Sequence, residues 1–227
     1  MTPRSVFVAG ATGYLGRAAI PLLLDRGPPV RALARPGSEA RVPSRAEAVP
    51  GEALRRESFE GWIAPADTFL QLVGVAHPSP SKADLFQTID LASAKASAEA
   101  TRAAGVAHFV YVSVAHPAPA MRAYWGARAE AEAFIAAKGL NATILRPWYV
   151  LGPGHLWPYL LLPGYWVAER LPRTRTTARR LGLVTLSQMA AAIVHAVENP
   201  VSGICIVEVP EIRTVRLDPG ALRRPAG

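Results

Sequence analysis

Residues 10–16 read Gly10-Ala11-Thr12-Gly13-Tyr14-Leu15-Gly16. The short apolar run at 5–9 leads into these glycines and predicts a buried strand. Apolar residues recur at helical spacing over 14–26, which predicts a helix that ends at Gly27. Residues 30–34 predict a second strand. The segment therefore forms a strand–helix–strand unit of about thirty residues, which is long enough for a parallel crossover.

The spacing of Gly10, Gly13 and Gly16 indicates a loop that holds a pyrophosphate. The N-terminus of a helix offers N–H groups and a positive dipole to a phosphate. Glycine allows the phosphate to approach the backbone and the helix to pack closely on the strand. Because this loop follows a strand and opens a helix, it predicts a dinucleotide site. The residues expected to contact the cofactor here are Gly10, Thr12, Gly13, Tyr14, Leu15 and Gly16.

The residues at the end of the second strand select the cofactor. An acidic residue there favours NAD(H), whereas an arginine accommodates the 2′-phosphate of NADP(H). This chain has Arg35 just past the strand and no acid, so we expect NADP(H) in preference to NAD(H). Arg31 is expected to be a secondary or solvent-facing charge. Arg17 either assists the phosphate or lies on a solvated helix face.

Strands and helices alternate through the rest of the chain, which predicts a parallel sheet covered on both faces. Further strands are expected at 46–49, 68–74, 106–114, 142–145 and 204–209, and further helices at 81–105, 124–138 and 187–198. We expect caps at Ser81, with Asp84 completing a capping box, and at Ser187.

The predicted fold class is α/β: a Rossmann-like doubly wound parallel sheet, strand order 3-2-1-4-5-6, with a small C-terminal substrate-side subdomain. The NAD(P)-binding core is expected over 1–151. The region 152–227 is expected to complete the same domain on the substrate side.

Composition narrows the class of protein. Half of the residues are hydrophobic and 19% are charged, which excludes a disordered chain. The single cysteine excludes an internal disulfide and, with no signal peptide or membrane span in the sequence, favours the cytoplasm. The net charge of +8 comes with no zinc-finger or RNA-binding pattern, so we expect no nucleic-acid partner and no metal. We expect a monomer or a homodimer.

With these motifs, the chain resembles the short-chain dehydrogenase/reductase superfamily, most closely its atypical extended branch. That branch includes NmrA-like proteins, epimerase/dehydratase-like proteins and the nucleotide-binding accessory subunit of respiratory complex I. The resemblance implies that Ser113 holds the substrate oxygen and that Tyr124 is the general acid/base. It also implies that Arg146 and Pro147, after the sixth strand, shape the cofactor and substrate pocket. Val73 and Gly74, at the end of the fourth strand, are also expected to contact the cofactor.

The chain departs from the family pattern at Arg128, where active members have a lysine four residues after the tyrosine. A guanidinium stabilises a tyrosinate but does not deprotonate, so it cannot relay a proton. Asp90 is a second departure, since some members carry a catalytic asparagine there. A capped or solvated helix residue is the alternative interpretation of Asp90.

Other site candidates follow the predicted strands. His77, His116 and His155 come after the fourth, fifth and sixth strands, where ligands bind in a doubly wound sheet. We expect His77 or His116 to support the substrate; a loop histidine bonded to backbone is the alternative. Trp148 begins an aromatic stretch over 148–167, followed by an arginine cluster. We expect this stretch to form one of three things: a hydrophobic substrate pocket, a peripheral membrane contact or a subunit interface.

These observations lead to one main function and one alternative. The main prediction is an NADP(H)-dependent oxidoreductase that transfers hydride to or from an apolar carbonyl, enone or quinone-like small molecule. The alternative is a non-catalytic NAD(P)H-binding protein with a regulatory or scaffolding role, which the arginine at position 128 favours. A membrane-associated lipid or sugar-nucleotide enzyme rests only on the aromatic stretch.

Overall fold

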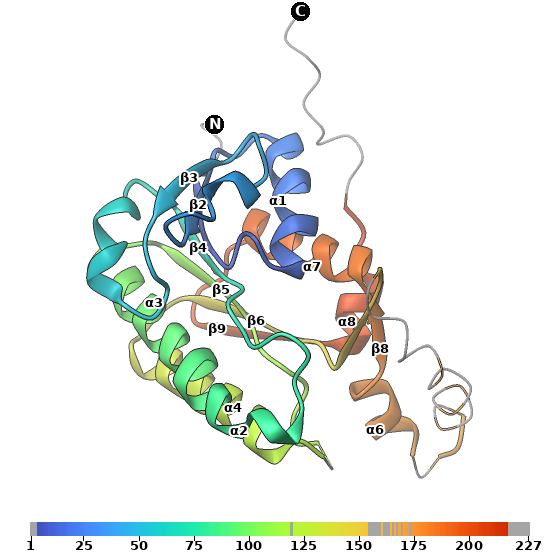
Figure 1. Cartoon of the computed structure of the whole chain (residues 1–227). Coiled ribbons are helices and arrows are strands. Elements are labelled where there is room, and N and C mark those ends of the chain that lie inside the picture. Colours follow the sequence, from blue (N-terminus) through green and yellow to red (C-terminus); the bar gives the residue numbers. More distant parts are fainter. Residues whose placement is uncertain are drawn as a thin grey trace, which may run out of the picture.

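The computed structural model describes residues 4–118, 120–153, 160, 164, 166, 168, 170–172 and 174–217. Its main feature is a seven-stranded parallel sheet of order β3-β2-β1-β4-β5-β6-β9 (Figure 1). The strands are β1 (Val6–Ala9), β2 (Val30–Ala34), β3 (Glu47–Pro50), β4 (Thr68–Gln71), β5 (His108–Val112), β6 (Ala142–Arg146) and β9 (Ile204–Glu208). The predicted fold class and the order of the first six strands are confirmed, and β9 extends the sheet beside β6.

Helices cover both faces of this sheet. On one face lie α1 (Tyr14–Arg26) and α7 (Leu186–Glu198), which pack against each other (Figure 1). On the other lie α3 (Ala92–Ala103) and α4 (Arg122–Ala137). Two layers of helices around one sheet bury the apolar side chains of both sheet faces.

Beyond the main sheet, β7 (Tyr149–Leu151) and β8 (Leu183–Thr185) form a separate parallel pair. The short helix α6 (Arg175–Arg180) precedes β8, and α8 (Val209–Thr214) follows β9. Residues after 151 therefore contribute both to this pair and to the main sheet, because β9 lies along β6 and α7 covers the α1 face.

The chain forms short 3₁₀ turns at η1 (Glu39–Arg41), η2 (Arg56–Ser58), η3 (Glu60–Trp62) and η4 (Pro80–Lys82).

The long helix predicted at 81–105 is interrupted. After η4 come one α-turn, α2 (Ala83–Leu85), and a π-helical segment, η5 (Phe86–Leu91), before α3 begins. A π-helix bonds residues five apart, so the helical face shifts within η5.

Both predicted helix caps were wrong. Ser79, not Ser81, precedes the first turn, because Pro80 occupies the first helical position, which proline favours. At α7 the cap is Thr185 rather than Ser187. Thr185 Oγ1 accepts the Gln188 N–H at 3.1 Å, and the Gln188 side chain accepts the Thr185 N–H at 2.8 Å. Thr185 and Gln188 thus form the capping box.

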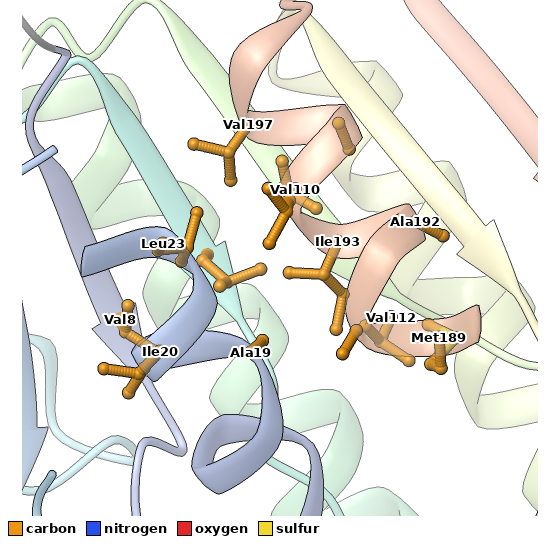
Figure 2. Packing of buried hydrophobic residues seen from close by; sticks show 14 of the residues in the cluster. Val8, Ala19, Ile20, Leu23, Val110, Val112, Met189, Ala192, Ile193 and Val197 are labelled. Atoms are coloured by element: carbon orange, nitrogen blue, oxygen red, sulfur yellow. The ribbon is translucent and has the colours of Figure 1, made fainter. Parts of the chain in front are cut away.

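The core on the α1 face depends on apolar contacts between the two helices and the strands beneath them. Figure 2 shows Leu23 of α1 and Ile193 of α7 above Val110 of β5. All three side chains are fully buried. This packing fixes α1, and with it the glycine loop at its N-terminus, against the sheet.

Replacement of Ile193 by alanine should lower the free energy of unfolding by about 2–5 kcal/mol, because it leaves a cavity between α1, α7 and β5. Ile206→Ala is the matched control, since 41% of Ile206 is exposed on β9. Urea unfolding of both variants measures the difference. Equal losses would contradict the assignment of this core.

Candidate active site

The glycine loop joins β1 to α1 and presents a bare helix N-terminus. Gly13 is the N-cap, with extended backbone and no side-chain cap, and the first turn of α1 holds no acidic residue. Gly13 N–H donates to the Gly10 carbonyl at 3.1 Å, which closes the turn. The free N–H groups and the positive helix dipole at this end suit a phosphate.

Gly10 allows this loop to lie directly on the end of β4. Its φ is +90°, and a Cβ at this position would lie 2.7 Å from the carbonyl carbon of Leu72 and 2.8 Å from the nitrogen of Val73. A Cβ on Gly16 would lie 2.5 Å from the Ala11 carbonyl oxygen. Positions 10 and 16 therefore require glycine, because a Cβ at either position would collide with backbone atoms unless the backbone shifted. Val73 and Gly74 consequently lie next to the loop.

The arginines around the loop differ in their partners. Arg31 pairs with Glu47 at 2.9 Å and donates to the carbonyl oxygen of Ala64 at 2.6 Å. Its charge is therefore already paired at the edge of the sheet. Arg35 and Arg17 are exposed and form no ion pair with the described residues. Two uncommitted guanidinium groups therefore flank the segment in which the sequence predicts the cofactor.

Arg128 is buried and held by three groups, one from η5 and two from β5. Its guanidinium pairs with Asp90 Oδ2 at 3.1 Å, donates to the Val112 carbonyl oxygen at 2.9 Å and reaches the Tyr111 hydroxyl at 3.3 Å. Only 5% of Arg128 is exposed. A Cβ on Gly74 would collide with this guanidinium, so Gly74 leaves the room that Arg128 occupies.

Asp90 is buried at the end of the π-helical segment, so the solvated interpretation of this residue was wrong. Its Oδ1 accepts the Val75 N–H at 2.7 Å, and its Oδ2 accepts from Arg128. Burial raises the pKa of Asp90, and the charge of Arg128 offsets part of that rise. The carboxylate thus joins the segment that follows β4 to helix α4.

Tyr124 lies one turn before Arg128 on α4. Its ring packs against Phe86 at 4.9 Å between centroids, and the guanidinium carbon of Arg128 lies 5.5 Å from the ring centre. Burial raises the pKa of Tyr124, and Arg128 reverses only part of this shift. The phenol therefore keeps its proton at neutral pH, as does that of the neighbouring Tyr111, whose pKa burial raises to about 12.

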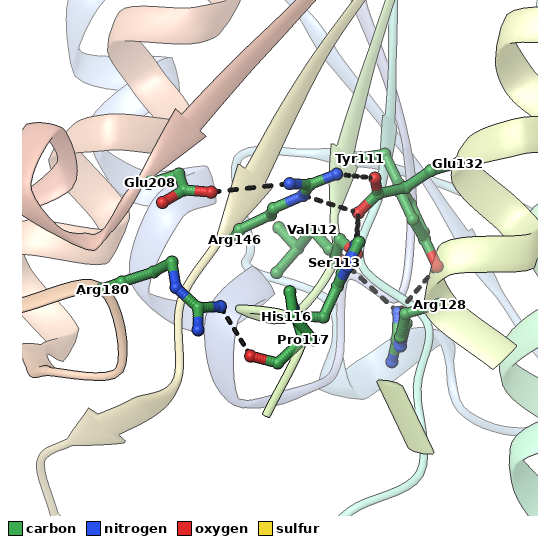
Figure 3. Close-up of polar contacts among 10 residues, drawn as sticks. All are labelled: Tyr111, Val112, Ser113, His116, Pro117, Arg128, Glu132, Arg146, Arg180 and Glu208. Atoms are coloured by element: carbon green, nitrogen blue, oxygen red, sulfur yellow. Dashed lines mark hydrogen bonds and ion pairs between the residues drawn. The ribbon is translucent and has the colours of Figure 1, made fainter. Parts of the chain in front are cut away.

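A second buried cluster centres on Glu132, the residue one turn after Arg128 (Figure 3). Ser113 Oγ donates to Glu132 Oε1 at 2.5 Å, and His116 Nε2 lies 3.2 Å from the same oxygen. Arg146 donates to both carboxylate oxygens and also lies 3.5 Å from Glu208 Oε1. The hydroxyl of Ser113 is therefore already engaged as a donor, which the sequence did not predict.

Glu132 was not predicted from the sequence, and neither was its pairing with Arg146. One signal was available: positions 124, 128 and 132 recur every four residues and so share a face of the helix. That spacing places Glu132 near Tyr124 and Arg128. The partners from β5 and β6 depend on tertiary contacts that spacing does not reveal.

The structure separates the predicted histidines. His116 is half-buried, bonded to Glu132 and stacked on Trp125 at 6.1 Å between centroids. His77 is exposed, with a φ of +51°, and its carbonyl oxygen accepts from Lys82 at 2.9 Å. His155 lies outside the described residues.

The segment after β6 carries two further predicted residues. Pro147 is buried, and its carbonyl oxygen accepts the Ala115 N–H at 2.8 Å. Trp148 is half-buried and packs with Trp125 around Ala115, Ala118 and Leu181. Most of the later aromatic stretch, including Trp157, Tyr159 and Tyr165, lies outside the described residues.

Among the described residues, no group of three histidine, cysteine or acidic residues is placed to hold a metal ion. No helix in the same part of the chain is long and apolar enough to cross a membrane.

Removal of the Asp90 charge should destabilise the protein, because Arg128 then loses its ion-pair partner. Asp90→Asn leaves the buried guanidinium without a counter-charge and should cost about 3 kcal/mol of unfolding free energy. Asp84→Asn, on the exposed side of the preceding turn, is the control and should change stability by less than about 0.5 kcal/mol. Equal midpoints in urea for the two variants would refute the structural importance of the pair.

The comparisons agree with this geometry. A family model described as NAD(P)H-binding matches residues 10–155, more than half of the chain. The ceramide reductase of Caulobacter vibrioides (strain NA1000 / CB15N) is 27% identical over 210 residues, 92% of this chain and 65% of that protein. This chain therefore spans somewhat less than two thirds of that relative.

Solved structures share the fold at low sequence identity. The Bordetella bronchiseptica enzyme WbmH in complex with NAD+ has a TM-score of 0.67 and 18% identity, covering 90% of this chain and 75% of that one. A short-chain dehydrogenase/reductase superfamily protein from Agrobacterium tumefaciens with bound NAD has a TM-score of 0.66 and 17% identity, covering 90% and 77%. UDP-N-acetylglucosamine 4-epimerase from Bacillus cereus has a TM-score of 0.64 and 16% identity, covering 90% and 75%.

The glycine loop, the parallel sheet and the matched model lead to one conclusion. This chain belongs to the NAD(P)H-binding family.

Proposed function

We propose that this chain is an NADP(H)-dependent oxidoreductase that reduces an apolar carbonyl, enone or quinone-like substrate. One observation carries the proposal: the end of β4 joins the glycine loop to the tyrosine site. Gly10 packs on Leu72 and Val73, and the next residue, Gly74, borders the Arg128 guanidinium beside Tyr124. A cofactor held by the loop would thus lie near a proton donor.

The residues of the loop fit a dinucleotide phosphate. The bare N-terminus of α1 would hold the pyrophosphate, and the uncommitted Arg35 would pair with a 2′-phosphate, which is the basis for NADP(H) over NAD(H). When bound, the nicotinamide supplies the hydride of the reaction.

Tyr124 would donate the proton to the substrate oxygen. Its raised pKa keeps the phenol protonated at neutral pH, and an alkoxide that forms on hydride transfer is a much stronger base than a phenolate. Arg128 would then stabilise the phenolate through its fixed positive charge. A guanidinium keeps its own proton, so Arg128 supports the charge and does not relay the proton.

The Glu132 cluster would orient His116. Because an ionised carboxylate only accepts hydrogen bonds, His116 Nε2 must be the donor to Glu132. That assignment leaves Nδ1 as the ring nitrogen that can meet a substrate. Ser113 shares the same carboxylate and thereby fixes its position, which makes it a positioning residue in this proposal.

The substrate class is supported by the surroundings and by a relative. Trp125 and Trp148 present apolar surface beside His116, and the similar Caulobacter protein is named a ceramide reductase. A carbonyl on a long apolar chain fits both. A cytoplasmic location and a monomer or homodimer remain part of the proposal.

The alternative is an NAD(P)H-binding protein without turnover. The commitment of Arg128 to Asp90 and of the Ser113 hydroxyl to Glu132 favours it, because both groups are used within the protein. The two experiments below separate cofactor binding from catalysis.

Arg35→Gln should weaken NADPH binding by about tenfold or more and leave NADH binding unchanged, because it removes a charge-assisted contact to the 2′-phosphate alone. Titration calorimetry with both cofactors measures this. Arg102→Gln, an equally exposed arginine on α3, is the control for net charge. Equal affinity of the wild-type protein for NADH and NADPH would refute the role of Arg35.

Tyr124→Phe should slow NADPH oxidation by about 100-fold or more against a panel of long-chain ketones, enones and quinones, because the proton donor is lost. The wild-type rate should show no loss from Tyr124 ionisation between pH 7 and 9, since the pKa of its phenol lies above the usual value. His77→Gln is the control and should keep the wild-type rate, whereas His116→Gln should lower it. Equal background rates in the wild-type and Tyr124→Phe proteins would favour the non-catalytic alternative.

A further inference from the structure

An open pocket with a volume of about 460 Å³ lies between α6 and the start of α8, outside the site described above. Four of its lining residues come from α6: Arg175, Thr176, Arg179 and Arg180. The other two are Glu208, at the end of β9, and Pro210. This volume is within the range of small-molecule sites.

The residues that line this pocket carry a net positive charge. Glu208 is the acidic residue of the lining, and its carboxylate is already used twice: it pairs with Arg146 at 3.5 Å and accepts the Glu211 N–H in the capping box of α8. Arg180 donates to the Pro117 carbonyl oxygen at 2.6 Å. Arg175 and Arg179 form no ion pair or side-chain hydrogen bond within the described part of the chain.

Arg175 and Arg179 lie four residues apart on α6, so their side chains share one face of the helix. Two like charges at this spacing destabilise a helix by a few tenths of a kcal/mol unless an anion lies between them. Guanidinium groups match the oxygen pairs of a phosphate through parallel N–H donors. Thr176 lines the same space and carries a hydroxyl group, which is a further hydrogen-bond donor.

The pocket also adjoins the proposed reduction site. Figure 3 shows Arg180 reaching Pro117, next to His116, and Glu208 reaching Arg146, which holds Glu132. Beyond Pro117, Leu181 packs with Trp125 and Trp148. The cationic pocket thus lies on one side of the 116–117 segment, and the apolar surface of the two tryptophans lies on the other.

We propose that Arg175, Thr176 and Arg179 bind the phosphoryl group of an amphipathic substrate whose apolar chain lies along the tryptophan side of His116. The anion site stands on the pocket alone, whereas its use by a substrate rests on the proposed reductase function.

Binding of hexyl phosphate, compared with hexanol and inorganic phosphate at constant ionic strength, tests the proposal. Hexyl phosphate should raise the unfolding temperature of the wild-type protein, and titration calorimetry should show it binding more tightly than either comparison ligand. The double variant Arg175→Gln/Arg179→Gln should weaken its binding by about tenfold or more, because two charge-assisted contacts are lost.

The matched control is Arg45→Gln/Arg102→Gln, which removes the same net charge from elements that do not line the pocket. It should bind hexyl phosphate as the wild type does. Both double variants should unfold close to the wild-type temperature without ligand and bind NADPH as before, because all four side chains are exposed and the Arg45–Asp25 pair is a surface ion pair of little weight. Hexyl phosphate binding measured without cofactor keeps this test separate from the test of reductase function.

Three results would overturn the proposal. The pocket would not be an anion site if hexyl phosphate failed to bind, or if both double variants bound it equally. Inorganic phosphate that bound as tightly as hexyl phosphate would overturn the amphipathic substrate and indicate a site for free phosphate.

Discussion

The close contact between Gly10 and the end of β4 is the constraint on which the rest of the site depends. The backbone of Leu72 and Val73 fills the space that a side chain at position 10 would need. Because α1 starts directly after this turn, the same contact sets where its N-terminus points. It also sets the course of residues 73–75, which border Arg128 and bond to Asp90. The glycine loop and helix α4, which carries Tyr124, thus both take their positions from one stretch of backbone.

Two buried acid–arginine pairs fill the carboxyl edge of the sheet around this stretch. Asp90 with Arg128 joins η5 to α4, and Glu132 with Arg146 joins α4 to β6. Each pair takes two charges out of water, which is costly unless further hydrogen bonds satisfy the remaining atoms. Val75, Val112 and Ser113 supply such bonds. The result is a rigid polar layer between the strands and α4 rather than an apolar one.

The sequence predicted the parts of this molecule that depend on local spacing. The glycine loop and the position of Tyr124 beside Arg128 follow from residues close together in the chain, and the strand order through β6 follows from the doubly wound fold that the loop indicates. The engagement of Ser113 by Glu132 does not, because it joins β5 to a helix nineteen residues away and needs Arg146 of a third element. The helix caps failed for a different reason. Several serines and threonines compete near each helix start, and only the complete pairing, as in Thr185 with Gln188, selects one.

The π-helical segment at Phe86–Leu91 has a consequence for comparison with related chains. A π-turn holds one more residue than an α-turn, so residues before it are rotated by about 100° relative to an unbroken helix. Asp90 lies within that segment, and its carboxylate reaches Arg128 from the rotated register. An ungapped alignment with a relative whose helix is regular would therefore pair residues from different helix faces on the two sides of this point. Functional equivalence in this helix has to be assigned from three-dimensional superposition rather than from position in the sequence.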